Sequence, residues 1–171
     1  MKKLISNPLI SFFITLGVIA LISLLGPEEK SLGSNVRIVY LHGAWVLAAE
    51  IAFIAAALAG LLGLLAAKIP ILSEKQARFY AWSAALGRTG IVFWVTYLPL
   101  SLWAMQANWN GLFLAEPRFR LALTFAVVGV FLQIGLWLFN LPWATATGNI
   151  LFIVILRYIF SSADYVMHPP P

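Results

Sequence analysis

The fold is decided by residues 39–67, which read VYLHGAWVLAAEIAFIAAALAGLLGLLAA. Only Glu50 is charged in this stretch, which exceeds the roughly 20 apolar residues that a helix needs to cross about 30 Å of hydrocarbon. We therefore expect a transmembrane helix. Small side chains in its second half would let a neighbouring helix backbone approach closely. These residues are Ala55, Ala56, Ala59, Gly60, Gly63, Ala66 and Ala67.

Further apolar stretches cover residues 8–26, 80–105, 121–140 and 150–166. Of the whole chain, 62% is hydrophobic and 10% is charged, with a mean hydropathy of +0.93. These features predict an all-α polytopic membrane bundle of five transmembrane helices, forming a single integral membrane domain over residues 1–171.

Residues within and between these apolar stretches lead to three further expectations. The first stretch follows two lysines, as a signal peptide would, but its apolar run is long and Gly26-Pro27 lacks a small-x-small cleavage pattern, so we expect a retained helix. Pro99 predicts a kink or an end of the third helix. Pro142 and Gly148 bracket an expected short turn over residues 141–148.

Basic residues near the helix ends set the expected orientation, because cytoplasmic loops carry more Lys and Arg. A cytoplasmic N terminus gives the inner face a small excess and places the C terminus outside. The chain is then a multi-pass protein of a bacterial or archaeal inner membrane. Its basic residues are scattered over loops, which argues against nucleic-acid binding. The inner set is Lys2, Lys3, Lys68, Lys75 and Arg78, and the outer set is Lys30, Arg37, Arg118 and Arg120.

Three charged residues fall inside the predicted spans: Glu50, Arg88 and Arg157. Each costs about 2.5 to 3.5 kcal/mol at the centre of a membrane, so we expect each to face the bundle, a polar cavity or a partner. Glu50 and Arg88 have similar predicted depths and could form a structural ion pair or a polar lining beneath a ligand site. Arg157 has no evident partner within the chain except Glu50, which suggests either a triad shared by the three charges or a contact with another subunit.

The two histidines, His42 and His168, lie on the same side of the membrane in this topology. Neutral imidazole is a common axial ligand of haem iron, and two imidazoles from different segments could hold one b-type haem. The alternative is that both are ordinary interfacial polar residues. The chain contains no Cys, which removes thiolate ligands and disulfides from consideration.

Residues 35–42, NVRIVYLH, followed by Ala44 and Trp45, resemble the first histidine segment of the haem-handling cytochrome c assembly family of the heme exporter protein C type. That family also has a tryptophan-rich outer loop, and Trp109, Glu116 and Arg118 keep its offsets of a leading Trp, an Asp seven residues later and an Arg nine residues later. The resemblance covers about residues 35–140 and includes residues 90–93.

The loop departs from the family pattern at several aromatic positions. The paired tryptophans correspond to Leu112 and Phe113, the last Trp to Ala115, and the Asp to Glu116. His168 corresponds to the second haem histidine by topology, and the sixth helix expected after it is absent. The chain is therefore similar to a shortened relative, either with a haem site or with a structural role alone.

The resemblance implies a haem-handling scaffold without catalytic turnover, binding haem b at the outer face for delivery to apocytochrome. Its expected partners are the lipid bilayer and other membrane subunits of a haem delivery or cytochrome assembly complex. It implies axial coordination by His42 and His168. The other expected contacts are an aromatic floor from Trp109 and Phe113, the loop carboxylate of Glu116, and propionate contacts from Arg118 or Arg120.

Two other classes of function stay open. The first is a structural or accessory subunit of a larger respiratory or photosynthetic membrane complex, without its own cofactor. The second is a small transporter that uses Glu50 and Arg88, although neither an internal repeat nor a pair of broken helices supports it.

Overall fold

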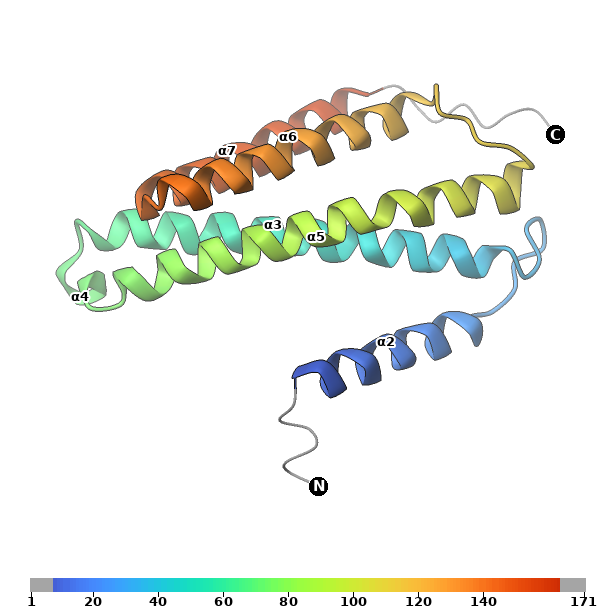
Figure 1. Cartoon of the computed structure of the whole chain (residues 1–171), viewed down its shortest axis with the longest axis horizontal. Coiled ribbons are helices and arrows are strands. Elements are labelled where there is room, and N and C mark those ends of the chain that lie inside the picture. The colour runs from blue at the N-terminus through green and yellow to red at the C-terminus, as the bar shows by residue number, and fades with distance from the viewer. Residues whose placement is uncertain (1–7, 164–171) are drawn as a thin grey trace.

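The structure, a computed structural model, describes residues 8–163 as a bundle of helices, in which the one bridge of β type joins Glu29 to Gly33 (Figure 1). The all-α prediction is confirmed. The helices in chain order are α2 (Pro8–Leu24), α3 (Val36–Ala66), α4 (Pro70–Ser73), α5 (Gln76–Trp109), α6 (Pro117–Phe139) and α7 (Pro142–Ser162).

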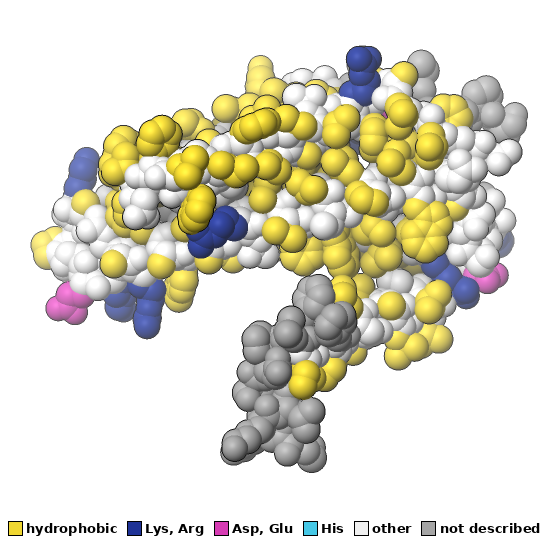
Figure 2. Space-filling model, in the orientation of Figure 1, with side chains coloured by type: hydrophobic (Ala, Val, Ile, Leu, Met, Phe, Trp, Pro, Cys, Tyr) yellow, Lys and Arg dark blue, Asp and Glu magenta, His cyan; other side chains and the backbone are white. Residues whose placement is uncertain are grey.

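Four of these helices, α3, α5, α6 and α7, are long and apolar enough to cross a membrane, which indicates a multi-pass membrane protein. Apolar side chains cover much of the molecule, and most charged side chains lie toward its two ends (Figure 2). Helix α2 has 17 residues, fewer than the roughly 20 that a crossing needs. The predicted crossing by residues 8–26 therefore stays a prediction.

Several predicted boundaries are wrong, and α3 and α6 also begin before the predicted residues 39 and 121. Helix α5 extends beyond residues 80–105 at both ends and does not end at Pro99. The kink expected at Pro99 stays a prediction. In a membrane helix, neighbouring groups can satisfy the backbone that an internal proline leaves free. The turn predicted over residues 141–148 is helical, because Asn140 ends α6 in the left-handed conformation (φ 49°) and Pro142 starts α7. Helix α7 thus begins eight residues before the predicted residue 150.

The bundle is built around α3 and α5, which make its most extensive helix contact, with α6 and α7 packed on this pair (Figure 1). The small-residue surface predicted on α3 takes part in this packing. Ala56, Ala59, Gly60, Gly63 and Ala66 are buried, whereas Ala67 is exposed. A Cβ atom at Gly60 would lie 3.0 Å from the Ser83 hydroxyl of α5, so a larger residue would push the helices apart.

A buried polar network joins α5, α6 and α7 near the opposite end from the loop at residues 110–116. The side-chain amide of Gln133 donates to Asn149 Oδ1 at 2.8 Å. Asn149 Nδ2 donates to the Ser83 backbone oxygen at 2.9 Å and to its hydroxyl at 3.0 Å. Hydrogen bonds between membrane helices fix their rotation and depth, because the alternative is a polar group in hydrocarbon.

Candidate functional site

A cavity of about 670 Å³ lies at the end of the bundle where α3 and α6 begin and α5 and α7 end. This volume falls within the range of about 300 to 1,000 Å³ that is usual for small-molecule pockets. The cavity is the candidate site, because it collects most of the residues that the sequence singled out.

Helix α3 presents one face to the cavity. Val39, His42, Val46 and Glu50 all line it, and their spacing of three or four residues keeps them on one side of the helix. The His42 ring lies 5.6 Å from the Tyr97 ring, centroid to centroid, at an interplanar angle of 39°. His42 is half-buried and lies six residues after the start of α3, roughly 9 Å along the helix axis.

Helix α5 supplies the opposite wall through Trp94, Tyr97, Ser101, Met105 and Asn108. These α5 residues were not predicted from the sequence as part of a site, although their spacing of three or four residues places them on one face of the helix. Trp94 is only 1% exposed, and its indole nitrogen donates to the Ala122 backbone oxygen of α6 at 3.0 Å. The wall is thus fixed to α6 at its deep end.

The predicted loop residues Trp109, Glu116 and Arg118 also line the cavity. Trp109 is the last residue of α5, because Asn110 takes the left-handed conformation (φ 52°) and ends the helix. The Glu116 carboxylate accepts a hydrogen bond from the Phe119 backbone N–H and so caps α6. Local turn and capping chemistry therefore brings the three side chains to the same wall.

Three polar atoms of the described residues are buried without a hydrogen-bond partner: Asn108 Oδ1, Glu116 Oε1 and Arg118 Nε. All three residues line the cavity. Buried polar groups are normally paired, so these three atoms lack the hydrogen bonds that such groups usually make. Among the lining residues, Asn108 and Glu116 carry hydrogen-bond acceptors and Arg118 carries a cationic donor.

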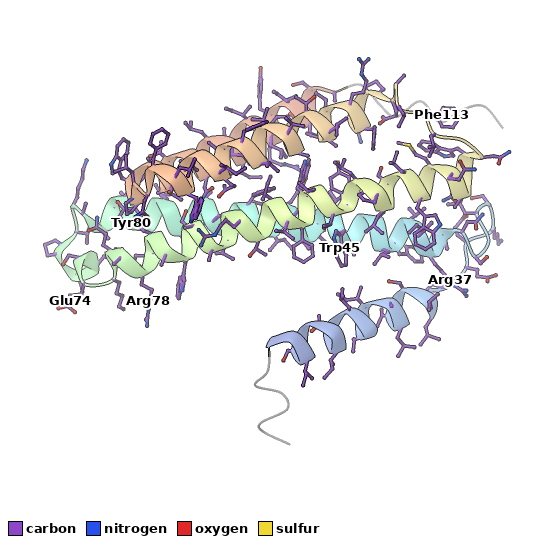
Figure 3. All side chains as sticks on the ribbon, in the orientation of Figure 1. Arg37, Trp45, Glu74, Arg78, Tyr80 and Phe113 are labelled. Carbon is purple, nitrogen blue, oxygen red and sulfur yellow. The ribbon has the colours of Figure 1, made fainter. Side chains whose placement is uncertain are left out.

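The other predicted ligand residues are not part of the lining. Phe113 is 38% exposed and packs its ring against Trp109, at 5.7 Å and 70°, near the end of the bundle that also carries Arg37 (Figure 3). Arg120 is exposed and follows Arg118 by two residues, which turns it about 200° around α6. His168 lies outside the described residues.

The intramembrane charges pair differently from the first expectation. Arg157 Nη1 lies 3.0 Å from Glu50 Oε1 and 3.1 Å from Oε2, and both residues line the deep part of the cavity. Arg88 instead faces a shallow groove beside Gln133, Ile134 and Trp137 of α6. The predicted Glu50–Arg88 pair is therefore wrong, and the alternative partner, Arg157, is the one found.

The loop between α2 and α3 closes one side of the cavity through Leu32. The Glu29 carboxylate accepts hydrogen bonds from the backbone of Ser31 at 2.9 Å and of Leu32 at 3.0 Å, and also from the Ser31 hydroxyl. The Ser31 hydroxyl contact, followed by the Leu32 contact, lowers the pKa of Glu29 below its usual value. Asn35 Nδ2 ties the loop to α5 by donating to the Ala107 oxygen at 2.8 Å.

The arrangement offers one imidazole, aromatic walls and two arginines around one cavity. Among residues 8–163, no group of three or more His, Cys, Asp or Glu side chains that could hold a metal ion is found. Comparisons with protein-family models, curated protein sequences and solved structures find no match to this chain.

Proposed function

We propose that the protein is a membrane haem-handling protein of c-type cytochrome biogenesis, which holds haem in the cavity for delivery to apocytochrome. One observation carries the proposal. His42, Trp109, Glu116 and Arg118, chosen from the sequence by the family resemblance, come from three helices and line the same cavity of about 670 Å³. The haem is cargo, and the protein binds and presents it without turning it over.

The residues of the cavity fit such a cargo. His42 would supply an axial imidazole, and Trp94, Tyr97 and Trp109 would supply aromatic surface for a planar macrocycle. Arg118, which lines the cavity, would bind a propionate. His168 would supply the second axial imidazole.

We also propose the membrane topology that delivery of haem to apocytochrome requires. A cytoplasmic N terminus and five crossings put the cavity at the outer face of a bacterial or archaeal inner membrane, where apocytochrome receives haem. The outer position brings His168 to the same side as His42. Other membrane subunits of a cytochrome assembly complex would be its partners.

The test is an absorption spectrum of the detergent-purified protein, made in cells supplied with haem and then titrated with haem. The expected result is a Soret band and the spectrum of a six-coordinate b-type centre, since two imidazoles fill both axial positions. A protein that stays colourless through the titration would contradict the proposal. It would instead favour a cofactor-free structural subunit of a larger membrane complex.

A further inference from the structure

The deep part of the cavity contains an arginine that is only partly used by its ion-pair partner. Both hydrogen bonds from Arg157 to Glu50 come from a single nitrogen, Nη1. The Arg157 side chain is 58% exposed, against 22% for Glu50. The Glu50 carboxylate is thus mostly covered by the protein, whereas the Arg157 guanidinium is largely accessible.

A guanidinium has five N–H donors in a fixed plane. Within residues 8–163, no hydrogen bond engages Nε or Nη2 of Arg157. These two nitrogens form the lateral edge of the guanidinium, whose parallel N–H groups match the two oxygens of a carboxylate. Glu50 therefore holds the arginine by one nitrogen and leaves a complete bidentate edge free.

The position of the pair makes that edge useful to a ligand. Glu50 follows His42 by eight residues on the same face of α3, about 12 Å deeper along the helix. The surrounding wall is apolar and aromatic, with Trp94 and Phe160 on the lining.

We infer that Arg157 is an anion-binding group at the floor of the cavity, which takes a carboxylate of an amphipathic ligand on its free Nε/Nη2 edge. Glu50 is the positioning residue that holds the guanidinium against α3. This inference rests on the proposed function in one respect only: haem, with its propionates, is the first ligand tested.

The experiment measures the affinity of the detergent-purified protein for haem and for haem dimethyl ester, which keeps the iron and macrocycle but lacks free carboxylates. The wild-type protein should bind haem more tightly than haem dimethyl ester. Arg157→Gln should lower haem affinity about tenfold or more and leave ester affinity nearly unchanged, because a charged hydrogen bond is lost only with the acid. Arg157→Lys keeps the charge but loses the fork, so it should recover only part of the preference.

Two further variants control for misfolding and for the general effect of removing an arginine. Glu50→Gln/Arg157→Gln removes both charges, so it folds without an unpaired buried carboxylate and should show the same loss of preference. Arg88→Gln is the matched control, because it removes an arginine of the membrane region that lies outside the cavity. Equal losses for haem and ester in the double variant, or unchanged affinity for both ligands, would overturn the inference.

A second probe separates this inference from the haem proposal. If wild type binds no haem, the same variants are tested with a spin-labelled long-chain fatty acid and its methyl ester. Acid binding that depends on Arg157 would support the anion site and reject haem as its ligand. Failure of wild type to bind the fatty acid as well as haem would overturn both proposals.

Discussion

Arg157 of α7 and Glu50 of α3 form an ion pair with a shortest N–O distance of 3.0 Å, although they are 107 residues apart in sequence. The pair joins the last helix to the first helix of the central pair, within the apolar part of the bundle. It also forms the floor of the cavity that holds His42. The same contact therefore links the packing of the helices to the shape of the candidate site.

The ion pair predicts an energetic coupling between the two residues. Glu50→Gln and Arg157→Gln should each lower the free energy of unfolding by about 1 to 2 kcal/mol, less than for a fully buried pair because Arg157 is half exposed. The double variant should lose clearly less than the sum, by about 1 kcal/mol. Denaturation in mixed micelles measures these values. The corresponding cycle with Arg88→Gln should be additive, and additivity in the Glu50–Arg157 cycle would contradict the pair.

The polar network around Asn149 predicts that Gly87→Ala is destabilising. A Cβ atom at Gly87 would lie 2.6 Å from Asn149 Oδ1, which already accepts from Gln133, so the network must shift. We expect a loss of about 1 to 3 kcal/mol in the same denaturation assay, as for other overpacked interiors. Gly135→Ala is the control, because nothing lies within 4 Å of its Cβ position. Equal stability of the two variants would show that the network does not restrict residue 87.

The proposed orientation predicts which loops are reached from outside the cell. The chain has no Cys, so single cysteines at Ser34, Ser73, Asn110 and Ser162 can be labelled without background. An impermeant maleimide added to intact cells should label positions 34, 110 and 162 and should reach position 73 only after lysis. Labelling of position 73 in intact cells would reverse the orientation and move the cavity to the cytoplasmic face.

Filling the cavity tests whether the ligand occupies it. Ala104 lines the cavity on α5, so Ala104→Trp should place an indole in the ligand volume and abolish haem binding in an absorbance titration. Ala81→Trp is the control, because Ala81 is exposed on the same helix, far from the cavity. The two variants should elute alike in size-exclusion chromatography. Haem binding that survives in Ala104→Trp would place the ligand elsewhere.

The helices were largely predictable because length and apolar composition are local properties. Their ends were less so: Asn110 and Asn140 end helices by taking left-handed conformations, while Pro99 does not end one. Apolar composition cannot separate these cases, because a cap depends on the backbone conformation of one residue. A proline is tolerated where neighbouring helices surround it, which depends on packing.

The candidate site was predictable where a motif fixed it and not where packing did. Trp109, Glu116 and Arg118 share one short segment, so their offsets carried the information. Tyr97 and Asn108 reach the cavity because of how α5 is rotated against α3, and Asn108 gave no chemical signal of its own. The same limit explains the mistaken partner of Glu50. Depth was estimated from residue counts, whereas rotation about the helix axis, at about 100° per residue, decides which arginine it meets.

The central claim, that His42 binds haem iron in this cavity, is tested most directly by chemical rescue of His42→Gly. We expect this variant to lose the Soret band of the haem-loaded protein, and added imidazole to restore it by occupying the vacated ligand position. His168→Ala should alter the coordination state by removing the second proposed ligand. A His42→Gly protein that binds haem like wild type, with a spectrum unchanged by imidazole, would contradict the account.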